Sequence, residues 1–233
     1  MLLSLSLKNR ETKSKMVKIS ERIYVCETEV SNKEYREFLN ALLAAKATDK
    51  YAKCLYDSAR WKDALTFSTP LTEYYHRHVA YNDYPVVNIT QQAMEYYCEW
   101  LGEKYARTTG KKFKRVVFRL PNDGEYKMMI IPFSMQEHSV KKDGQKISLS
   151  NVKDDQMVKN GETELTAPVY AYKPNKLGLY NIIGNVSEVS KEGHITGGNF
   201  TIPMAECVGG QYQTYSLPDA RVGFRYVMEV VEF

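Results

Sequence analysis

The chain has 233 residues, of which 43% are hydrophobic and 26% charged, and its formal net charge is +4. This ordinary composition provides enough apolar residues for a buried core that does not depend on disulfides or a structural metal. Because acidic residues are scattered among the basic ones, and the basic run 111–115 flanks an apolar stretch, the charge argues against a nucleic-acid partner.

The N-terminal half shows two strong helix signals. Residues 1–16 are mostly polar and are expected to form an arm before a domain that spans 17–233. Ser31 and Glu34 have capping-box spacing, and apolar residues follow at helical intervals, which predicts a helix to about residue 45. Residues 46–83 have weak periodicity and many tyrosines, which favours a long ordered loop. Residues 84–89 read as a short strand, and Thr90 caps a second predicted helix.

The C-terminal half is less regular. Residues 116–120 form a β-type run, and Asn122 with Glu125 repeats the capping-box spacing at the start of a third helix. Residues 135–166 are polar with turn signals. The glycine-rich last third, which closes with an apolar run at 221–228, predicts irregular structure with small strands. The sequence has no internal repeat or low-complexity linker, so we expect one domain.

Cysteine usage and the N-terminus say little about the compartment. Cys26, Cys54, Cys98 and Cys207 are far apart and lack C-x-x-C or metal-finger spacing, so no oxidising compartment is required, although disulfides stay open. The apolar start is too short for a signal peptide, and no run approaches the length of a transmembrane span. A cytoplasmic protein and an exported form without its leader are both compatible with this chain.

Five blocks, in order along the chain, resemble the motifs of one family. They are Glu27–Asn32 with Tyr35 and Phe38, Tyr84–Asn88 with Ala93, Tyr97, Cys98, Trp100 and Leu101, Arg119–Pro121 with Glu125 and Tyr126, Gly178–Asn181 with Gly184–Val186 and Glu188, and Gly197–Phe200 with Gly223–Arg225. Together they are similar to the formylglycine-generating enzyme (sulfatase-modifying factor) domain, a variant of the C-type lectin fold. The resemblance implies a single irregular α+β domain with few helices and short strands. A narrower similarity, around 75–85, is to the branch with gliding-motility lipoproteins.

The resemblance also implies where catalytic copper would bind. In the active oxidases two cysteines, at the second and seventh positions after the motif aromatic, hold Cu(I), which soft thiolates select. Counted from Phe200, these positions are Ile202 and Cys207, so the catalytic candidate Cys207 lacks its partner. We expect copper to be absent unless Cys26 or Cys54 folds close to it. The three-histidine iron site of another branch is not matched by His76, His78, His138 and His194.

Calcium is the other metal that the resemblance implies. The family turn binds Ca²⁺ through two side chains and two backbone carbonyls, which correspond here to Asn181, Glu188, Gly184 and Val186. All four supply hard oxygen donors, as Ca²⁺ requires. The alternative is that Asn181 and Glu188 only hydrogen-bond the turn.

These observations favour a non-catalytic binding or scaffold domain with a protein or glycan ligand. The expected ligand surface contains Phe200, Tyr212 and Tyr215, because aromatic side chains give contact area at low entropic cost. Two alternatives stay open: an oxidase that converts a protein cysteine to formylglycine, and a structural component of a bacterial cell-envelope or gliding assembly. The sequence does not indicate an oligomeric state.

Overall fold

The computed structural model describes residues 15–65, 68–133, 139–142, 145–153, 165–209 and 213–233. Its helices are α1 (Asn32–Ala44), α2 (Thr48–Lys53), α3 (Trp61–Ala64), α4 (Thr69–Tyr74), α5 (Gln91–Ala106), α6 (Asp123–Ile130) and α8 (Met204–Gly209), with 3₁₀ turns η1 (Ser58–Arg60) and η2 (Val79–Tyr81). Its strands are β1 (Met16–Lys18), β2 (Ile23–Cys26), β3 (Arg115–Arg119), β4 (Ser139–Lys142), β5 (Gln145–Ser148), β6 (Ser187–Val189), β7 (His194–Thr196), β8 (Gln213–Thr214), β9 (Val222–Gly223) and β10 (Val227–Glu232). The expected α+β domain with few helices and short strands is confirmed.

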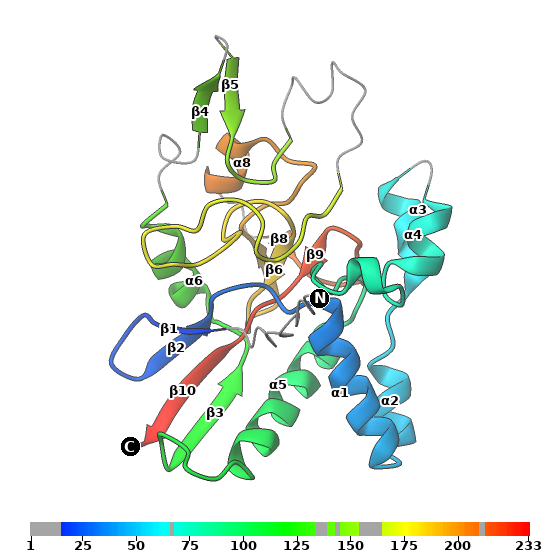
Figure 1. The fold of residues 1–233 in the computed structure, drawn as a ribbon, viewed down its shortest axis with the longest axis vertical. Coiled ribbons are helices and arrows are strands. Elements are labelled where there is room, and N and C mark those ends of the chain that lie inside the picture. Colours follow the sequence, from blue (N-terminus) through cyan, green and yellow to red (C-terminus); the bar gives the residue numbers. More distant parts are fainter. Residues whose placement is uncertain (1–14, 66–67, 134–138, 143–144, 154–164, 210–212) are drawn as a thin grey trace, which may run out of the picture.

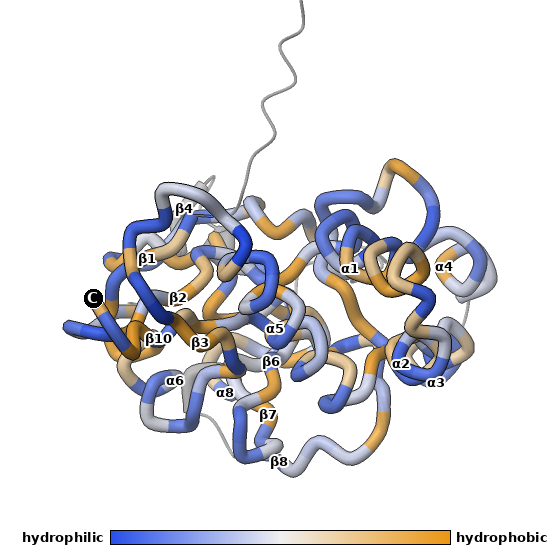
Figure 2. The backbone as a smooth tube through the Cα atoms, turned by 90° about the horizontal axis from the view of Figure 1, so that it is seen from below, coloured by the Kyte–Doolittle hydropathy of each residue, from blue (hydrophilic) through white to orange (hydrophobic). Residues whose placement is uncertain are grey.

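The first sheet joins the two ends of the described chain. Its strand order is β1-β2-β10-β3, with every neighbouring pair antiparallel, so β10 lies between two strands that precede it by about a hundred residues or more. Figure 2 shows apolar stretches, in orange, along β2 and β10. The first strand begins at Met16, the last residue that the sequence assigned to the arm.

The two longest helices, α1 and α5, both begin as the sequence predicts. In α1 the Ser31 hydroxyl accepts from the Glu34 amide, and the Glu34 carboxylate accepts from the Ser31 amide. The Thr90 hydroxyl accepts from the Ala93 amide at the start of α5. The apolar face of α1 packs against α5, and α5 packs along β3 (Figure 1).

The second sheet carries the glycine-rich part of the chain. Its order is β8-β7-β6-β9, in which only the β6–β9 pair is parallel. These strands contain two or three residues each. The turn before β6 uses left-handed backbone at Gly184, and the turn after β7 uses it at Gly197 and Gly198. The C-terminal third is therefore irregular, as its glycine content predicts.

The expectation of a long loop at 46–83 is wrong. The described residues of this segment form three short helices and two 3₁₀ turns, none of which is long enough to show apolar periodicity. They are held by local caps, such as the Asp57 carboxylate that accepts from the Ala59 amide, and by burial of Trp61, Leu71 and Tyr75 in one core cluster.

The expected strand at 84–89 is also wrong. Its only ladder contact among the described residues is an isolated bridge between Pro85 and Ser31. Asn88, at φ 61°, interrupts the extended backbone that a strand needs.

The polar stretch 135–166 is described in part, and it contains the antiparallel hairpin of β4 and β5 at the top of Figure 1. None of the helices among the described residues is long and apolar enough to cross a bilayer.

Candidate functional site

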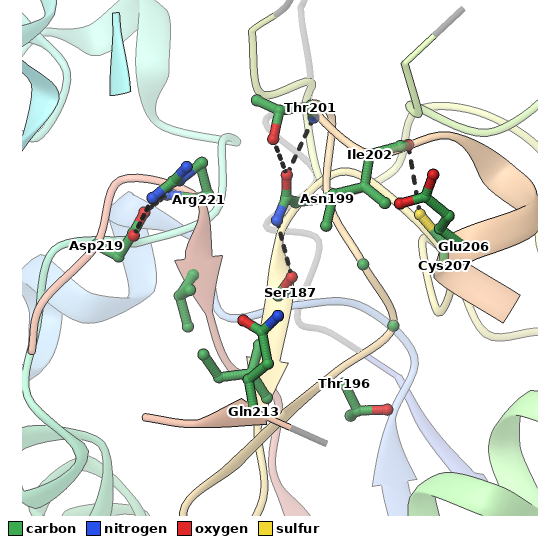
Figure 3. Close-up of a pocket in the computed structure, with 14 residues that line it drawn as sticks. Ser187, Thr196, Asn199, Thr201, Ile202, Glu206, Cys207, Gln213, Asp219 and Arg221 are labelled. Atoms are coloured by element: carbon green, nitrogen blue, oxygen red, sulfur yellow. Dashed lines mark hydrogen bonds and ion pairs between the residues drawn. The ribbon is translucent and has the colours of Figure 1, made fainter. Parts of the chain in front are cut away.

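A cavity of about 640 Å³ opens beside the second sheet (Figure 3). One wall comes from β7 and the glycine turn that follows it, and another from the loop and first turn of α8. The third wall is the segment 219–222, which leads into β9. Its volume lies in the usual range of small-ligand pockets.

The floor of this pocket is polar and fixed by its own hydrogen bonds. Asn199, which is buried, donates to the Ser187 hydroxyl at 3.0 Å. The side-chain oxygen of Asn199 accepts from the Thr201 hydroxyl at 2.7 Å and from the Thr201 amide at 3.0 Å. These bonds hold the polar side chains of the floor in fixed positions, so a ligand would not have to order them on binding.

An ion pair forms the opposite wall. Arg221 holds the Asp219 carboxylate through two side-chain contacts, of 2.9 and 2.6 Å, and through its own amide at 2.8 Å. Burial alone would raise the pKa of Asp219, but the hydrogen bonds and charge of Arg221 outweigh it and lower that pKa. Both charges are partly exposed, so they remain available to a ligand.

Cys207 lies in this pocket as a buried, protonated thiol. It is 3% exposed, and its Sγ donates to the Ile202 carbonyl oxygen at 3.5 Å. Burial raises its pKa to about 12, so almost no thiolate exists at neutral pH. Because the thiolate is the nucleophile and the metal ligand, Cys207 in this state is suited to neither role.

No other cysteine is brought to Cys207 in the described core. Cys207 packs with Ile202 in one apolar cluster, whereas Cys26, Cys54 and Cys98 belong to the cluster around α1 and α5. All four are free and buried.

Because residue 198 is a glycine, Cys207 of α8 can pack directly against the backbone at this position. A Cβ on Gly198 would lie 2.2 Å from the Cys207 Sγ and 2.9 Å from its Cα. Gly198 also has φ 68°, which glycine tolerates best. The absence of a side chain at Gly198 therefore allows α8 to pack directly against the wall of the pocket.

The expected ligand surface is corrected by the structure. Phe200 is fully buried, and Tyr215 is 8% exposed, with its hydroxyl donating to the Ile89 carbonyl at 2.6 Å. Neither ring presents contact area to a ligand, because both are buried and Tyr215 packs in the core cluster around α1 and α5. Tyr212 lies outside the described residues.

At the turn 181–188, which the resemblance implies in calcium binding, Glu188 forms a buried ion pair with Arg225. The Arg225 guanidinium binds both oxygens of Glu188 at 2.6 and 2.7 Å, and the Tyr126 hydroxyl donates to one of them. The other N–H groups of Arg225 donate to the carbonyls of Cys26, Glu27 and Tyr180, so all five are satisfied. Arg225 thus ties β2, the 178–185 turn and β6 together.

A second buried carboxylate, Glu29, completes this cluster. Asn185 donates to it at 2.8 Å and Asn181 at 3.1 Å. Burial raises the pKa of Glu29 to about 8; Arg225 lowers this value in part, and Glu188 adds to the rise. Both Glu29 and Arg225 lie in motif blocks that resemble the family, but the resemblance assigned neither residue a role.

The four residues expected to bind calcium fit a cation only in part. The Oδ1 atom of Asn181 is buried and has no hydrogen-bond partner, as a missing ligand would leave it. Glu188, in contrast, has both oxygens on Arg225, and a divalent ion would have to take one of these contacts. Gly184 and Val186, whose backbone carbonyls the resemblance implies as the other two ligands, lie in the same segment before β6.

The histidines occupy separate places. His76 is buried, stacks on Tyr56 and contacts the Val87 carbonyl, and burial lowers its pKa to about 3. His78 caps η2, and His194 contacts Asp123 at 2.7 Å. His138 lies outside the described residues. Within the described part of the chain, no group of three or more His, Cys, Asp or Glu side chains could hold a metal.

Similarity to solved structures supports the fold. The crystal structure of CarF is similar with a TM-score of 0.58 and 18% identity over 94% of each chain. Treponema denticola variable protein 1 is similar with a TM-score of 0.52 and 16% identity, over 89% of this chain and 84% of that one. No curated protein sequence matches the chain.

A family model described as the sulfatase-modifying factor enzyme 1-like domain matches residues 4–230. This match covers nearly the whole chain, in agreement with the motif blocks and with the fold. The chain belongs to the sulfatase-modifying factor enzyme 1-like domain family.

Proposed function

We propose that this domain is a binding module that uses the pocket beside the second sheet and does not oxidise cysteine. The observation that carries the proposal is the contact between positions 202 and 207, where the Cys207 thiol meets the backbone of an isoleucine. An alkyl side chain has no lone pair for Cu(I), and one protonated thiol cannot form a two-sulfur site.

The chemistry of the pocket favours a peptide segment as ligand. The described lining combines amide, hydroxyl and carboxylate groups with the Asp219–Arg221 pair, which can meet both the N–H and C=O groups of a peptide. No aromatic side chain is among the described lining residues, so they offer a sugar ring no flat face for stacking.

Selection from a random peptide library displayed on phage tests this proposal. The full chain is expected to enrich a sequence family, and Glu206→Arg in the pocket is expected to abolish the enrichment by reversing one charge. Glu73→Arg on α4, which is exposed and outside the pocket lining, is the matched control and should enrich the same peptides. Enrichment that is unaffected by Glu206→Arg, or binding only to a glycan array, would contradict a peptide pocket.

Restoring the missing sulfur is the first prediction. Ile202→Cys is expected to confer binding of one Cu(I), because the Ile202 side chain already packs against the apolar cluster that contains Cys207. The wild type and Ile202→Ser are expected to leave Cu(I) with a competing colorimetric chelator. In parallel, the wild type incubated with Cu(I), oxygen and a Cys-x-Pro-x-Arg peptide should yield no aldehyde. Aldehyde that is lost in Cys207→Ser would establish the oxidase alternative instead.

Calcium is a second, separate proposal for the 181–188 turn. Supporting it are the unpartnered Asn181 oxygen and the presence of two buried carboxylates, Glu29 and Glu188, beside a single guanidinium. A bound cation would satisfy the Asn181 oxygen and favour the ionised form of Glu29, whose pKa is raised to about 8 by burial, with Glu188 giving up one contact to Arg225.

The prediction is that millimolar Ca²⁺ raises the thermal midpoint by several degrees over a chelated sample, while Mg²⁺ does not. Asn181→Ala should remove the response. An unchanged midpoint would mean that Arg225 alone neutralises Glu188.

A further inference from the structure

A second hollow, of about 420 Å³, lies where the C-terminal half of α5 meets the first sheet. Leu101 and Tyr105 of α5 form one side, and the sheet contributes Tyr24, Phe118 and Met228. Of these elements, α5, β3 and β10 lie in the lower part of Figure 1, and β2 pairs with β10. The groove is lined mainly by apolar side chains, so water in it is easily displaced by an apolar ligand.

The edge of this groove is preformed. The Tyr105 hydroxyl donates to the Phe113 carbonyl at 3.3 Å and accepts from the Phe113 amide at 3.0 Å. This pair of bonds fixes the segment after α5 against the helix and holds Lys112 beside the groove.

The charged side chains that line the groove are both lysines, Lys104 and Lys112. The Lys112 ammonium lies 5.5 Å from the ring centroid of Tyr24 and 5.1 Å from that of Phe113. No carboxylate pairs with it among the residues that the structure describes. Lys104 has a weak, exposed pair with Glu37 at 3.8 Å. The groove therefore combines an apolar floor with positive charge at its rim.

We propose that this groove binds a free fatty acid, with the aliphatic tail on the apolar floor and the carboxylate at the lysines. An aliphatic tail gains from leaving water and needs no hydrogen bonds from the floor. A peptide would bring N–H and C=O groups that such a floor leaves unsatisfied. The two ammonium groups select an anionic head. This site is independent of the pocket beside the second sheet.

Calorimetric titration of the full chain with dodecanoate, below its micelle concentration, tests the proposal. Saturable binding is expected, and dodecyltrimethylammonium, which has the same tail and the opposite charge, should bind more weakly. Lys104→Glu/Lys112→Glu is expected to weaken dodecanoate binding by about tenfold. The matched control Lys33→Glu/Lys62→Glu changes two exposed lysines outside the groove by the same charge and should bind as the wild type does.

A further variant tests the apolar part. Thr108→Phe adds bulk at an exposed position in the groove wall and should weaken both amphiphiles. The proposal is overturned if dodecanoate shows no saturable binding, if both double variants lose affinity equally, or if the cationic amphiphile binds the wild type as tightly.

Discussion

Replacement of Arg225 by leucine is expected to destabilise the domain by about 3–5 kcal/mol, the usual cost of removing one partner of a buried ion pair. The variant leaves the carboxylate of Glu188 buried without its counter-charge. The substitution takes the guanidinium donor from three backbone carbonyls, of which that of Glu27 keeps the Tyr180 amide as a donor. It also removes the positive charge that lowers the pKa of Glu29. Urea unfolding followed by circular dichroism measures the change.

Arg221→Leu is the matched control. It also removes an arginine from a two-contact ion pair near the second sheet, but the side chains of Arg221 and Asp219 are 39% and 29% exposed. Water can solvate the remaining carboxylate, so the expected loss is about 1 kcal/mol. Equal losses in the two variants would show that Arg225 does not organise the fold.

Substitution of Gly198 by alanine is expected to cost about 2–4 kcal/mol, from left-handed strain and overpacking together. The new methyl group would overlap the Sγ, Cβ and Cα atoms of Cys207, so relief requires α8 to move. We therefore also expect faster reaction of the Cys207 thiol with a thiol reagent, because displacement of α8 exposes it.

Gly110→Ala separates the two contributions. Gly110 has φ 64°, close to the 68° of Gly198, but a Cβ there meets nothing within 4 Å. The Gly110→Ala variant should therefore be destabilised only by backbone strain, by about 1 kcal/mol, and the reactivity of the Cys207 thiol should not change. If both glycine variants behave alike, the close packing of α8 does not shape the pocket.

Local signals in the sequence predicted the long elements well. Both capping boxes and the Thr90 cap are present, because capping depends on side chains within one turn of the helix start. The prediction for segment 46–83 was wrong because its helices have only four to six residues, too few turns for an apolar periodicity to show. The family motifs predicted the fold, since they mark the turns that the glycine-rich C-terminal third needs.

The functional residues were predicted less completely. The spacing after Phe200 identified the 202–207 pair, and the structure places these residues in contact at a pocket. The burial of Phe200 and Tyr215 could not be read from their spacing, because short irregular segments carry no periodicity that distinguishes inside from outside. The roles of Glu29 and Arg225 depend on contacts between residues up to about two hundred positions apart.

The placement of β10 has a consequence for biosynthesis. Of the four strands of the first sheet, the one synthesised last, β10, is an inner strand, so β2 and β3 have no shared neighbour until residues 227–232 have emerged from the ribosome. Such non-local pairing slows folding and leaves strand edges exposed to other chains. Translation that stops before residue 222 would lack both this strand and Arg225, and its product should aggregate or be degraded rather than accumulate as a folded fragment.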